Sequence, residues 1–345
     1  METCLILLII QSRGDILIKK HRRIPLRVHI LRAMKRRVQP KHEKYEEILS
    51  ELGMKEAGIY GEQSLDYYLT LLPETDTPYY IFHDLRLPYR DSHFQIDTLI
   101  LFSTFCLLLE VKYLRGIIHF DPKNQQLIQE VENKPLKALQ DPILQVSNQC
   151  HKLESWMKNK NLAIAPTEKL VVLTNPKVIV KALSYPSIVE KHVIKSPGLS
   201  VKVDPYLRKH SFIHYDKKTL NKISKQLNKD HTPLQSSPIG QYKVFPSDIL
   251  TGVLCPDCNP NVVMQRIHGK WKCPVCSLIS ADAHIQALID YALLISTVIT
   301  MSELKRFLRI NNNHVIRLII RNMNLSGNGQ TKSRTYNLTP LLHKL

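Results

Sequence analysis

Two neighbouring segments, Gln95-Ile96-Asp97-Thr98-Leu99 and Leu108-Leu109-Glu110-Val111-Lys112, determine the expected fold of the central part of the chain. They belong to two almost wholly apolar runs, residues 94–103 and 105–113, which predict strands covered on both faces, as in the centre of an α/β sheet. A turn at Ser103-Thr104 would pair the strands antiparallel and bring Asp97 beside Glu110. Because side chains alternate along a strand, Glu110 and Lys112 should share one face.

Charged groups at the end of a buried strand need compensation, since an unpaired buried charge is costly. Asp97, Glu110 and Lys112 together suit metal-assisted cleavage of a phosphodiester. Mg²⁺ prefers carboxylate oxygens, water and phosphate, and it lowers the pKa of a bound water. A lysine can orient that water or offset developing charge. The alternative is a structural Glu-Lys pair at the rim of a sheet, because Glu-x-Lys triplets are common.

Further motifs accompany this triplet in a defined order along roughly residues 60–174. They are Gly61-Glu62-Gln63, His83-Asp84-Leu85-Arg86-Leu87-Pro88, the two segments quoted above followed by Gly116, and Asp141-Pro142-Ile143-Leu144-Gln145. In this order they resemble the nuclease-related domain (NERD) family, which is similar to the PD-(D/E)xK nucleases in fold and site. One departure is Ile96, which stands where the nuclease motif has proline.

The resemblance implies roles for five residues. Asp97 and Glu110 would bind Mg²⁺ (or Mn²⁺), and Lys112 would be the catalytic lysine. Glu62, expected near the start of the first helix of the domain, would make a water-mediated metal contact, and Gln145 would line the site from a later helix. The expected function is a metal-dependent endonuclease acting on nucleic acid, with DNA the expected form. The alternative is a non-catalytic DNA-binding protein with a vestigial site.

A second metal site is predicted by two C-x-x-C turns, Cys255-Pro-Asp-Cys258 and Cys273-Pro-Val-Cys276, separated by 14 residues. Four thiolates complete a tetrahedral, closed Zn²⁺ site, so this zinc should be structural. The strand-like residues 262–267 and 270–271 flank a His268-Gly269 turn, as expected of the hairpin in a zinc ribbon. A redox role for the cysteines is the less favoured alternative.

The C-terminal residues resemble a winged helix-turn-helix. A short helix from Met301, with Ser302 as its candidate N-cap, precedes the polar stop Asn311-Asn312-Asn313, a second helix over 314–323 and a basic turn over 326–334. In such a module the second helix enters the major groove and the hairpin meets phosphates. The candidate DNA contacts are Arg317, Arg321, Lys332 and Arg334. A helical cap whose basic residues are only solvated is the alternative.

The net charge of +18 favours a polyanionic partner, and the excess lies at both ends of the chain. Residues 13–44 hold twelve Lys or Arg against two acids, so this arm would either contact phosphates or form a solvated helix face. A membrane-surface protein is a third possibility. The early apolar run, residues 4–10, is too short to span a membrane and lacks the flanks of a secretory signal. Scattered cysteines suit a reducing compartment, and we expect a cytoplasmic protein.

The expected fold class is α/β, a mixed sheet flanked by helices in a restriction-endonuclease-like core, with a small zinc ribbon and an α-rich C-terminal module. Four domains are expected: a basic helical N-terminal arm (1–56), the nuclease-related domain (57–235), a linker and zinc ribbon (236–282), and a helical, winged-helix-like nucleic-acid-binding module (283–345).

Overall fold

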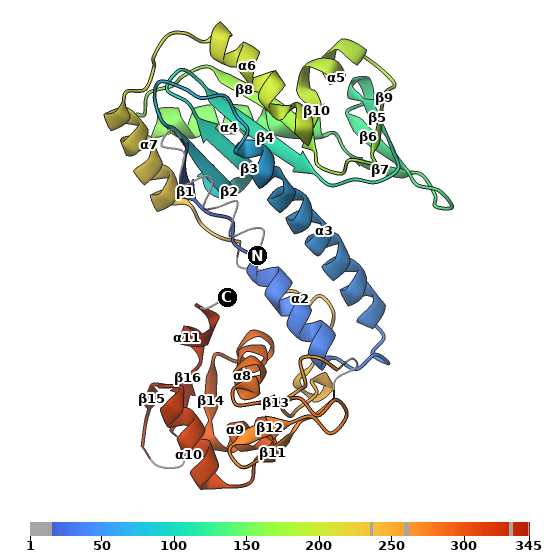
Figure 1. Cartoon of the computed structure of the whole chain (residues 1–345), viewed down its shortest axis with the longest axis vertical. Helices are drawn as coiled ribbons and strands as arrows, with labels where there is room; N and C mark the ends of the chain where they lie inside the picture. The colour runs from blue at the N-terminus through green and yellow to red at the C-terminus, as the bar shows by residue number, and fades with distance from the viewer. Residues whose placement is uncertain (1–15, 235–236, 259–261, 331–333, 344) are drawn as a thin grey trace. The chain divides into compact units, whose positions relative to one another are not determined.

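The chain forms two compact units in a computed structural model that describes residues 16–234, 237–258, 262–330, 334–343 and 345. One unit consists of Met1–Arg23 and Glu56–Leu234, and the other of Ile24–Lys55 and Gln235–Leu345. Figure 1 labels the elements of each. This division groups residues 24–55 with the C-terminal half of the chain. The four-domain division expected from the sequence is finer, and its boundaries remain predictions.

The first unit is built on a mixed six-stranded sheet in the order β1-β2-β3-β4-β8-β10. The pairs β2/β3 and β3/β4 are antiparallel, and the other three pairs are parallel. The expected mixed α/β architecture is therefore confirmed. The strands are β1 (Ile16–Lys20), β2 (Tyr79–Tyr89), β3 (Ser92–Leu101), β4 (Cys106–Lys112), β8 (Thr167–Leu173) and β10 (Val193–Lys195).

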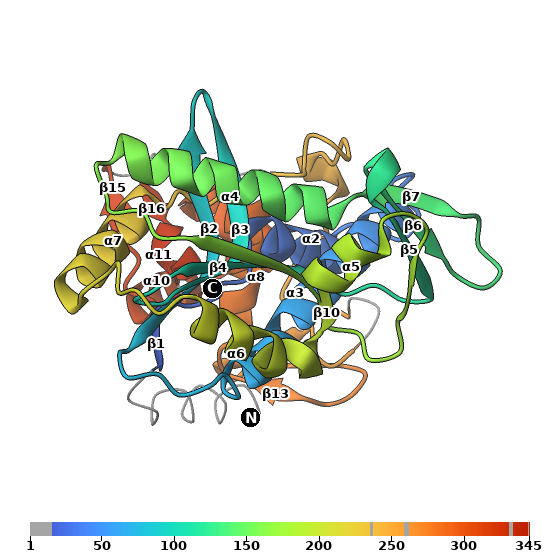
Figure 2. The same cartoon turned by 90° about the horizontal axis from the view of Figure 1, so that it is seen from above.

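Helices cover both faces of this sheet, as Figure 2 shows for α4 and α6 on opposite sides. Apolar side chains of α4 (Pro142–Asn159) and α7 (Lys217–Asp230) join one buried cluster, and those of α3 (Tyr45–Leu69) and α6 (Leu199–Lys209) join the other. The central strands β3 and β4 contribute to both clusters. This explains why their sequences are continuous apolar runs rather than alternating ones.

A second, four-stranded sheet of the same unit follows β4 in the chain, in the order β7-β6-β5-β9. The elements here are β5 (Ile117–Asp121), η1 (Pro122–Asn124), β6 (Gln126–Glu130), β7 (Lys137–Gln140), β9 (Ile179–Ala182), α5 (Pro186–His192) and η2 (Ser196–Gly198).

The helix expected to begin at Gly61 is part of the single 25-residue helix α3, which starts at Tyr45. Gly61 is a helix breaker only by intrinsic propensity, and packing overrides that preference here. A Cβ at this position would lie 2.4 Å from the Cβ of Tyr113, directly after β4. Glycine thus permits the close approach of α3 to the end of β4.

The second unit contains a three-stranded ribbon and a helical module. The ribbon strands are β11 (Gln265–Ile267), β12 (Lys270–Lys272) and β13 (Ile279–Ser280); the remaining elements are α2 (Leu26–Arg37), η3 (Pro246–Asp248), α8 (Ala283–Leu294), β14 (Val298–Thr300), α9 (Met301–Leu308), α10 (Asn313–Asn322), β15 (Gly327–Asn328), β16 (Thr335–Asn337) and α11 (Thr339–Leu342). The apolar stretch from Ala283 onward forms the helix α8 followed by the strand β14. The N-cap of α9 is Thr300, which forms a capping box with Glu303, so the expected cap Ser302 was wrong.

An ion cluster is buried inside this second unit. The Arg37 side chain and the Asp290 side chain are each 1% exposed, and Arg37 Nε donates to Asp290 Oδ2 at 2.8 Å. Arg37 Nη1 also donates to the carbonyls of Leu250 and Gly252. Arg36 donates to the other carboxylate oxygen of Asp290. Part of the basic N-terminal arm is thus used in internal ion pairs rather than solvated.

Candidate active site and metal centre

Asp97 lies where β3 and β4 separate. Their antiparallel ladder ends at the pair Thr98–Leu109, whereas β4 continues to pair with β8 through Glu110 and Lys112. The Asp97 Oδ2 accepts a hydrogen bond from the backbone N–H of Val111 at 2.8 Å. The carboxylate thus satisfies a backbone donor that has lost its strand partner, and it is held next to Glu110.

A distortion of β2 and β3 helps to place this carboxylate. Phe82 and Leu85, an odd number of residues apart, belong to the same buried cluster, as do Ile96 and Leu99 on the partner strand. Regular alternation would put each pair on opposite faces. Between them Asp84 has φ of 53°, in the left-handed region that Asp tolerates. Both strands therefore change face at the level of Asp97.

Glu110 is buried, with its side chain 1% exposed, and both of its oxygens accept hydrogen bonds. Lys112 Nζ donates to Oε1 at 2.6 Å, and Gln149 Nε2 donates to Oε2 at 2.8 Å. Lys112 Nζ also donates to Gln145 Oε1 at 3.2 Å. The structure therefore brings together Glu110, Lys112 and Gln145, which the sequence singled out, and adds Gln149 one helical turn further along α4.

Carboxylates gather at this site. Burial, followed by the charges of Glu110 and Glu62, raises the pKa of Asp97 well above its usual range. Burial also raises the pKa of Glu62, with Arg22 opposing that shift and the neighbouring carboxylates of Asp84, Glu110 and Asp66 adding to it. Like charges held in a poorly hydrated place disfavour ionisation. The site would therefore be stabilised by an added cation.

Glu62 is in the interior of α3, not near the start of its helix as expected. Its Oε2 pairs with Arg22 Nη1 at 3.0 Å. The same guanidinium donates to Asp66 Oδ1 at 3.1 Å and to Thr98 Oγ1 at 3.0 Å. Thr98 Oγ1 in turn contacts the buried imidazole of His83. Arg22, which follows the edge strand β1, thus links α3 to β3 beside Asp97.

The carboxylate oxygens of this site suit a hard cation, because Mg²⁺ prefers oxygen ligands. Asp97 is only half-buried and Lys112 is 28% exposed, so solvent reaches the site. The carboxylates are close enough to interact electrostatically, but their oxygens do not converge on one point. Among the residues that the structure describes, only the four ribbon cysteines form a group of three or more candidate ligands within 4.8 Å of one another. Asp97 and Glu110 would hold the cation, and Glu62 would contact it indirectly.

The cysteines of the ribbon converge as predicted. Cys255 and Cys276 have Sγ atoms 3.6 Å apart, as do Cys258 and Cys273. These distances exceed a disulfide bond and match the sulfur–sulfur edge of about 3.8 Å in a tetrahedron with zinc–sulfur bonds of about 2.3 Å. The β11/β12 hairpin and its positive-φ turn at His268-Gly269 hold the two C-x-x-C turns together. The site therefore fits a structural zinc ion.

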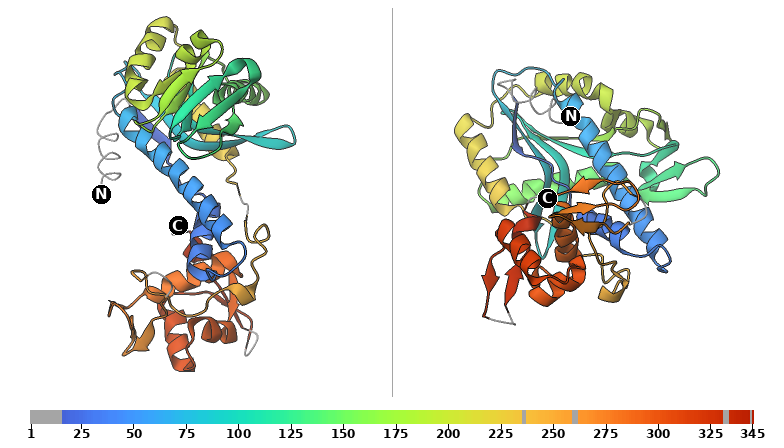
Figure 3. Two further views of the ribbon diagram at one scale, coloured as in Figure 1. Left: turned by 90° about the vertical axis from the view of Figure 1, so that its right-hand side faces the viewer. Right: turned by 60° about the horizontal axis from the view of Figure 1, so that its bottom comes forward.

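The C-terminal elements follow one another as α8, β14, α9, α10, β15 and β16, with the sheet order β14-β16-β15. Two helices followed by a hairpin are the order expected of a winged helix-turn-helix, and that assignment remains a prediction. The hairpin of β15 and β16 is visible beside the red helices in Figure 3. Arg317 and Arg321 on α10 and Arg334 before β16 are exposed and line one open recess with Tyr336. Lys332, the fourth candidate, lies outside the described residues.

Sequence reasoning did not identify Gln149 and Arg22 as site residues. Gln149 follows Gln145 by four residues, and helical spacing alone could have placed both on one face of α4. Arg22 carries no such signal, because it is one of many cations in the N-terminal arm and lies 40 residues from Glu62 in sequence.

Comparison with protein families bears on the first unit. The family model of the nuclease-related domain, NERD, matches residues 57–174. This match covers about a third of the chain and includes Glu62, Asp97, Glu110, Lys112 and Gln145. It excludes Arg22, α7 and the whole C-terminal half. Searches of curated proteins and of solved structures found no match. Within the described residues, no helix is long and apolar enough to cross a membrane.

Proposed function

We propose that this chain is a Mg²⁺-dependent endonuclease that hydrolyses phosphodiester bonds in DNA. The observation that carries the proposal is the position of Asp97 where β3 and β4 separate, beside Glu110 and the Lys112 amine. The nuclease-related match over the same residues supports it. A metal ion bound there would activate water and offset negative charge on the phosphate.

The residues of the chain have separate tasks in this proposal. Lys112 Nζ, held by Glu110 and Gln145, would donate a hydrogen bond to the attacking water or to a phosphate oxygen. Arg22 would fix Glu62, and Gln149 would fix Glu110. Gln149 Oε1 is buried without a partner among the described residues, so it is an acceptor available to an ordered water.

Arg317, Arg321 and Arg334 would hold the DNA. Two of these lie four residues apart on the exposed face of α10, and the third lies at the hairpin, so they can meet neighbouring phosphates or base edges. The charge excess at the C-terminal end supports the same partner. A cytoplasmic location remains the expectation from the sequence.

Cleavage of DNA by the purified full chain tests the enzymatic part. We expect cleavage that needs Mg²⁺ and that falls at least about 10²-fold in Glu110→Ala with its fold intact by circular dichroism. Lys181→Ala, at an exposed position in β9, is the matched control and should cleave as the parent does. No cleavage by the parent over a range of divalent metals and DNA forms would refute the proposed nuclease activity.

A non-catalytic DNA-binding protein is the second candidate. It is favoured by one observation: both oxygens of Glu110 are already bonded to Lys112 and Gln149. If the protein binds DNA without catalysis, the parent and Glu110→Ala should bind DNA equally and neither should cut it.

A further inference from the structure

Helix α7 carries a row of lysines that the proposed function does not use. Lys218, Lys222, Lys225 and Lys229, here called the α7 stripe, are all exposed. At 100° per residue these four positions fall within about 60° of arc. The apolar side chains Leu220, Ile223 and Leu227 lie on the opposite side and are buried in the core. The stripe therefore faces solvent along the helix.

The charges of the stripe are largely unneutralised within the described part of the chain, where only Asp216, the N-cap of α7, interacts electrostatically with one of them, Lys218. None of the four lysines forms an ion pair there, whereas Lys160, Lys209 and Lys112 all pair with carboxylates. The stripe extends about 16 Å at 1.5 Å per residue. One strand of a DNA duplex presents a phosphate about every 3.4 Å along the axis, so a strand running beside α7 would place several phosphates within reach.

The stripe leads toward the candidate active site. Asn228 Nδ2 near the end of α7 donates to the carbonyl of Lys19 in β1 at 3.4 Å, and His231 Nδ1 accepts from the backbone N–H of Arg86 in β2 at 3.1 Å. Lys20, next to Lys19, donates to the carbonyls of His83 and Asp84. Figure 1 shows α7 beside β1 and β2. The end of the stripe thus adjoins the strands that position Asp97 and Arg22.

We propose that the α7 stripe binds the phosphodiester backbone of nucleic acid and guides it to the acidic site of the same unit. This inference rests on the proposed function and adds a substrate-binding surface outside the nuclease-related match. Nucleic acid is favoured over a membrane because a membrane-binding amphipathic helix inserts its apolar face. The apolar face of α7 is already buried against the sheet. Its lysines can offer only electrostatic contacts.

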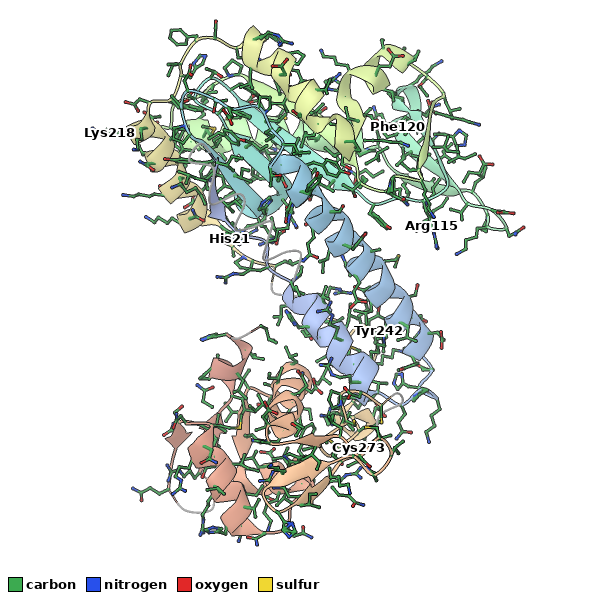
Figure 4. All side chains as sticks on the ribbon, in the orientation of Figure 1. His21, Arg115, Phe120, Lys218, Tyr242 and Cys273 are labelled. Carbon is green, nitrogen blue, oxygen red and sulfur yellow. The ribbon has the colours of Figure 1, made fainter. Side chains whose placement is uncertain are left out.

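Two quadruple variants of the full chain test the proposal. In the first, Lys218, Lys222, Lys225 and Lys229 are changed to Gln. In the matched control, the four exposed lysines Lys123, Lys134, Lys137 and Lys181 around the four-stranded sheet are changed to Gln. Both sets remove the same charge from the same unit. Figure 4 shows Lys218 and Phe120, which mark α7 and that sheet, on opposite sides of the unit.

Binding is measured by fluorescence anisotropy of a labelled DNA duplex over a salt series, with Glu110→Gln added to each protein to prevent cleavage. Each phosphate contact contributes about 0.9 to the slope of log K against log salt concentration. We expect the stripe variant to lose up to about 3.6 from this slope and at least about tenfold in affinity at low salt. The control variant should change little. Equal affinities and slopes for the two variants would overturn the proposal.

The remaining outcomes separate this inference from the proposed function. If the stripe variant loses binding but the parent with Glu110 intact never cleaves, the proposed binding surface stands and the proposed nuclease activity does not. If the parent cleaves and the stripe variant cleaves with an unchanged KM, the nuclease stands and the surface does not. Binding of the parent to vesicles rich in anionic lipid, with none to DNA or RNA, would overturn both in favour of a membrane partner. Gln and Lys have similar helix propensity, so α7 should stay folded.

Discussion

Lys112→Met is the change that most directly tests how the acidic site is held together. Methionine keeps the unbranched chain but removes the amine that donates to Glu110 at 2.6 Å. Glu110 is 1% exposed, so its carboxylate cannot recover that contact from bulk water. Gln149 would then be its one remaining side-chain donor among the described residues.

The size of the effect follows from this geometry. Removing one partner of a buried ion pair costs about 3–5 kcal/mol of unfolding free energy. Because Lys112 is itself 28% exposed and Gln149 keeps its hydrogen bond, we expect a smaller cost than this range, about 2–3 kcal/mol, in metal-free protein. Mg²⁺ should restore more stability to Lys112→Met than to the parent, since the cation would replace the lost counter-charge. A ligand at ten times its Kd adds about 1.4 kcal/mol.

Tryptophan fluorescence can follow the unfolding of the first unit, which holds the acidic site, by itself. The chain has two tryptophans, Trp156 on α4 and Trp271 in the ribbon. In a Trp271→Phe background, urea unfolding followed through the buried Trp156 measures the first unit. Lys181→Met is the control. If Lys112→Met unfolds within about 0.5 kcal/mol of the parent, or if Mg²⁺ shifts both equally, the proposed charge compensation is wrong.

Three further changes probe the remaining charges and the zinc site. Burial and neighbouring carboxylates raise the pKa of Asp97 above its usual value of 3.8. Between these two pKa values the native metal-free protein holds a proton that the unfolded chain has released. Its stability should therefore fall as pH rises from 3.8 through the raised pKa. Asp97→Asn should flatten that fall in urea titrations, and an unchanged pH slope would contradict the assignment. Asp290→Ala should lower the free energy of unfolding by about 3–5 kcal/mol because it leaves the buried charge of Arg37 unpaired, whereas Asp290→Leu combined with Arg37→Met should lower it far less. Unfolding followed through Trp271 in a Trp156→Phe background measures both variants. Equal losses in the two would argue against an ion-pair origin. Removal of zinc by a chelator, or Cys273→Ser, should shift the emission of Trp271 to longer wavelength, and an unchanged spectrum in metal-free protein would exclude a structural zinc.

The sequence predicted the core of the first unit because buried strands leave a continuous apolar pattern. The runs around Leu99 and Leu108 gave β3 and β4 to within two residues, and their turn fixed the pairing that places Asp97 beside Glu110. The beginning of α3 was missed because Gly61 reads as a helix breaker in the sequence. Glycine stands at position 61 because Tyr113 approaches it closely, and this contact joins residues far apart in the chain.

The N-cap of α9 shows the opposite case, in which the sequence contained the answer. Thr300 is followed three residues later by Glu303, the capping-box spacing, whereas Ser302 is followed at that distance by Lys305. The carboxylate of Glu303 can accept a hydrogen bond from the Thr300 backbone N–H, which a lysine cannot do. Local chemistry of this kind can be predicted. The ion pairs of Arg22 and Arg37, which join distant segments, cannot.

The charge balance of the acidic site supports a bound cation independently of any family likeness. Five carboxylates, those of Glu62, Asp66, Asp84, Asp97 and Glu110, lie near three cationic groups, Arg22, Lys20 and Lys112. With all eight groups ionised the site carries a formal charge of −2, which one divalent cation would neutralise. Without that cation the raised pKa of Asp97 is the expected response, because taking up a proton is the other way to reduce the charge. Arg22, contributed from outside the nuclease-related match, bonds two of these carboxylates directly and is part of the same charge arrangement.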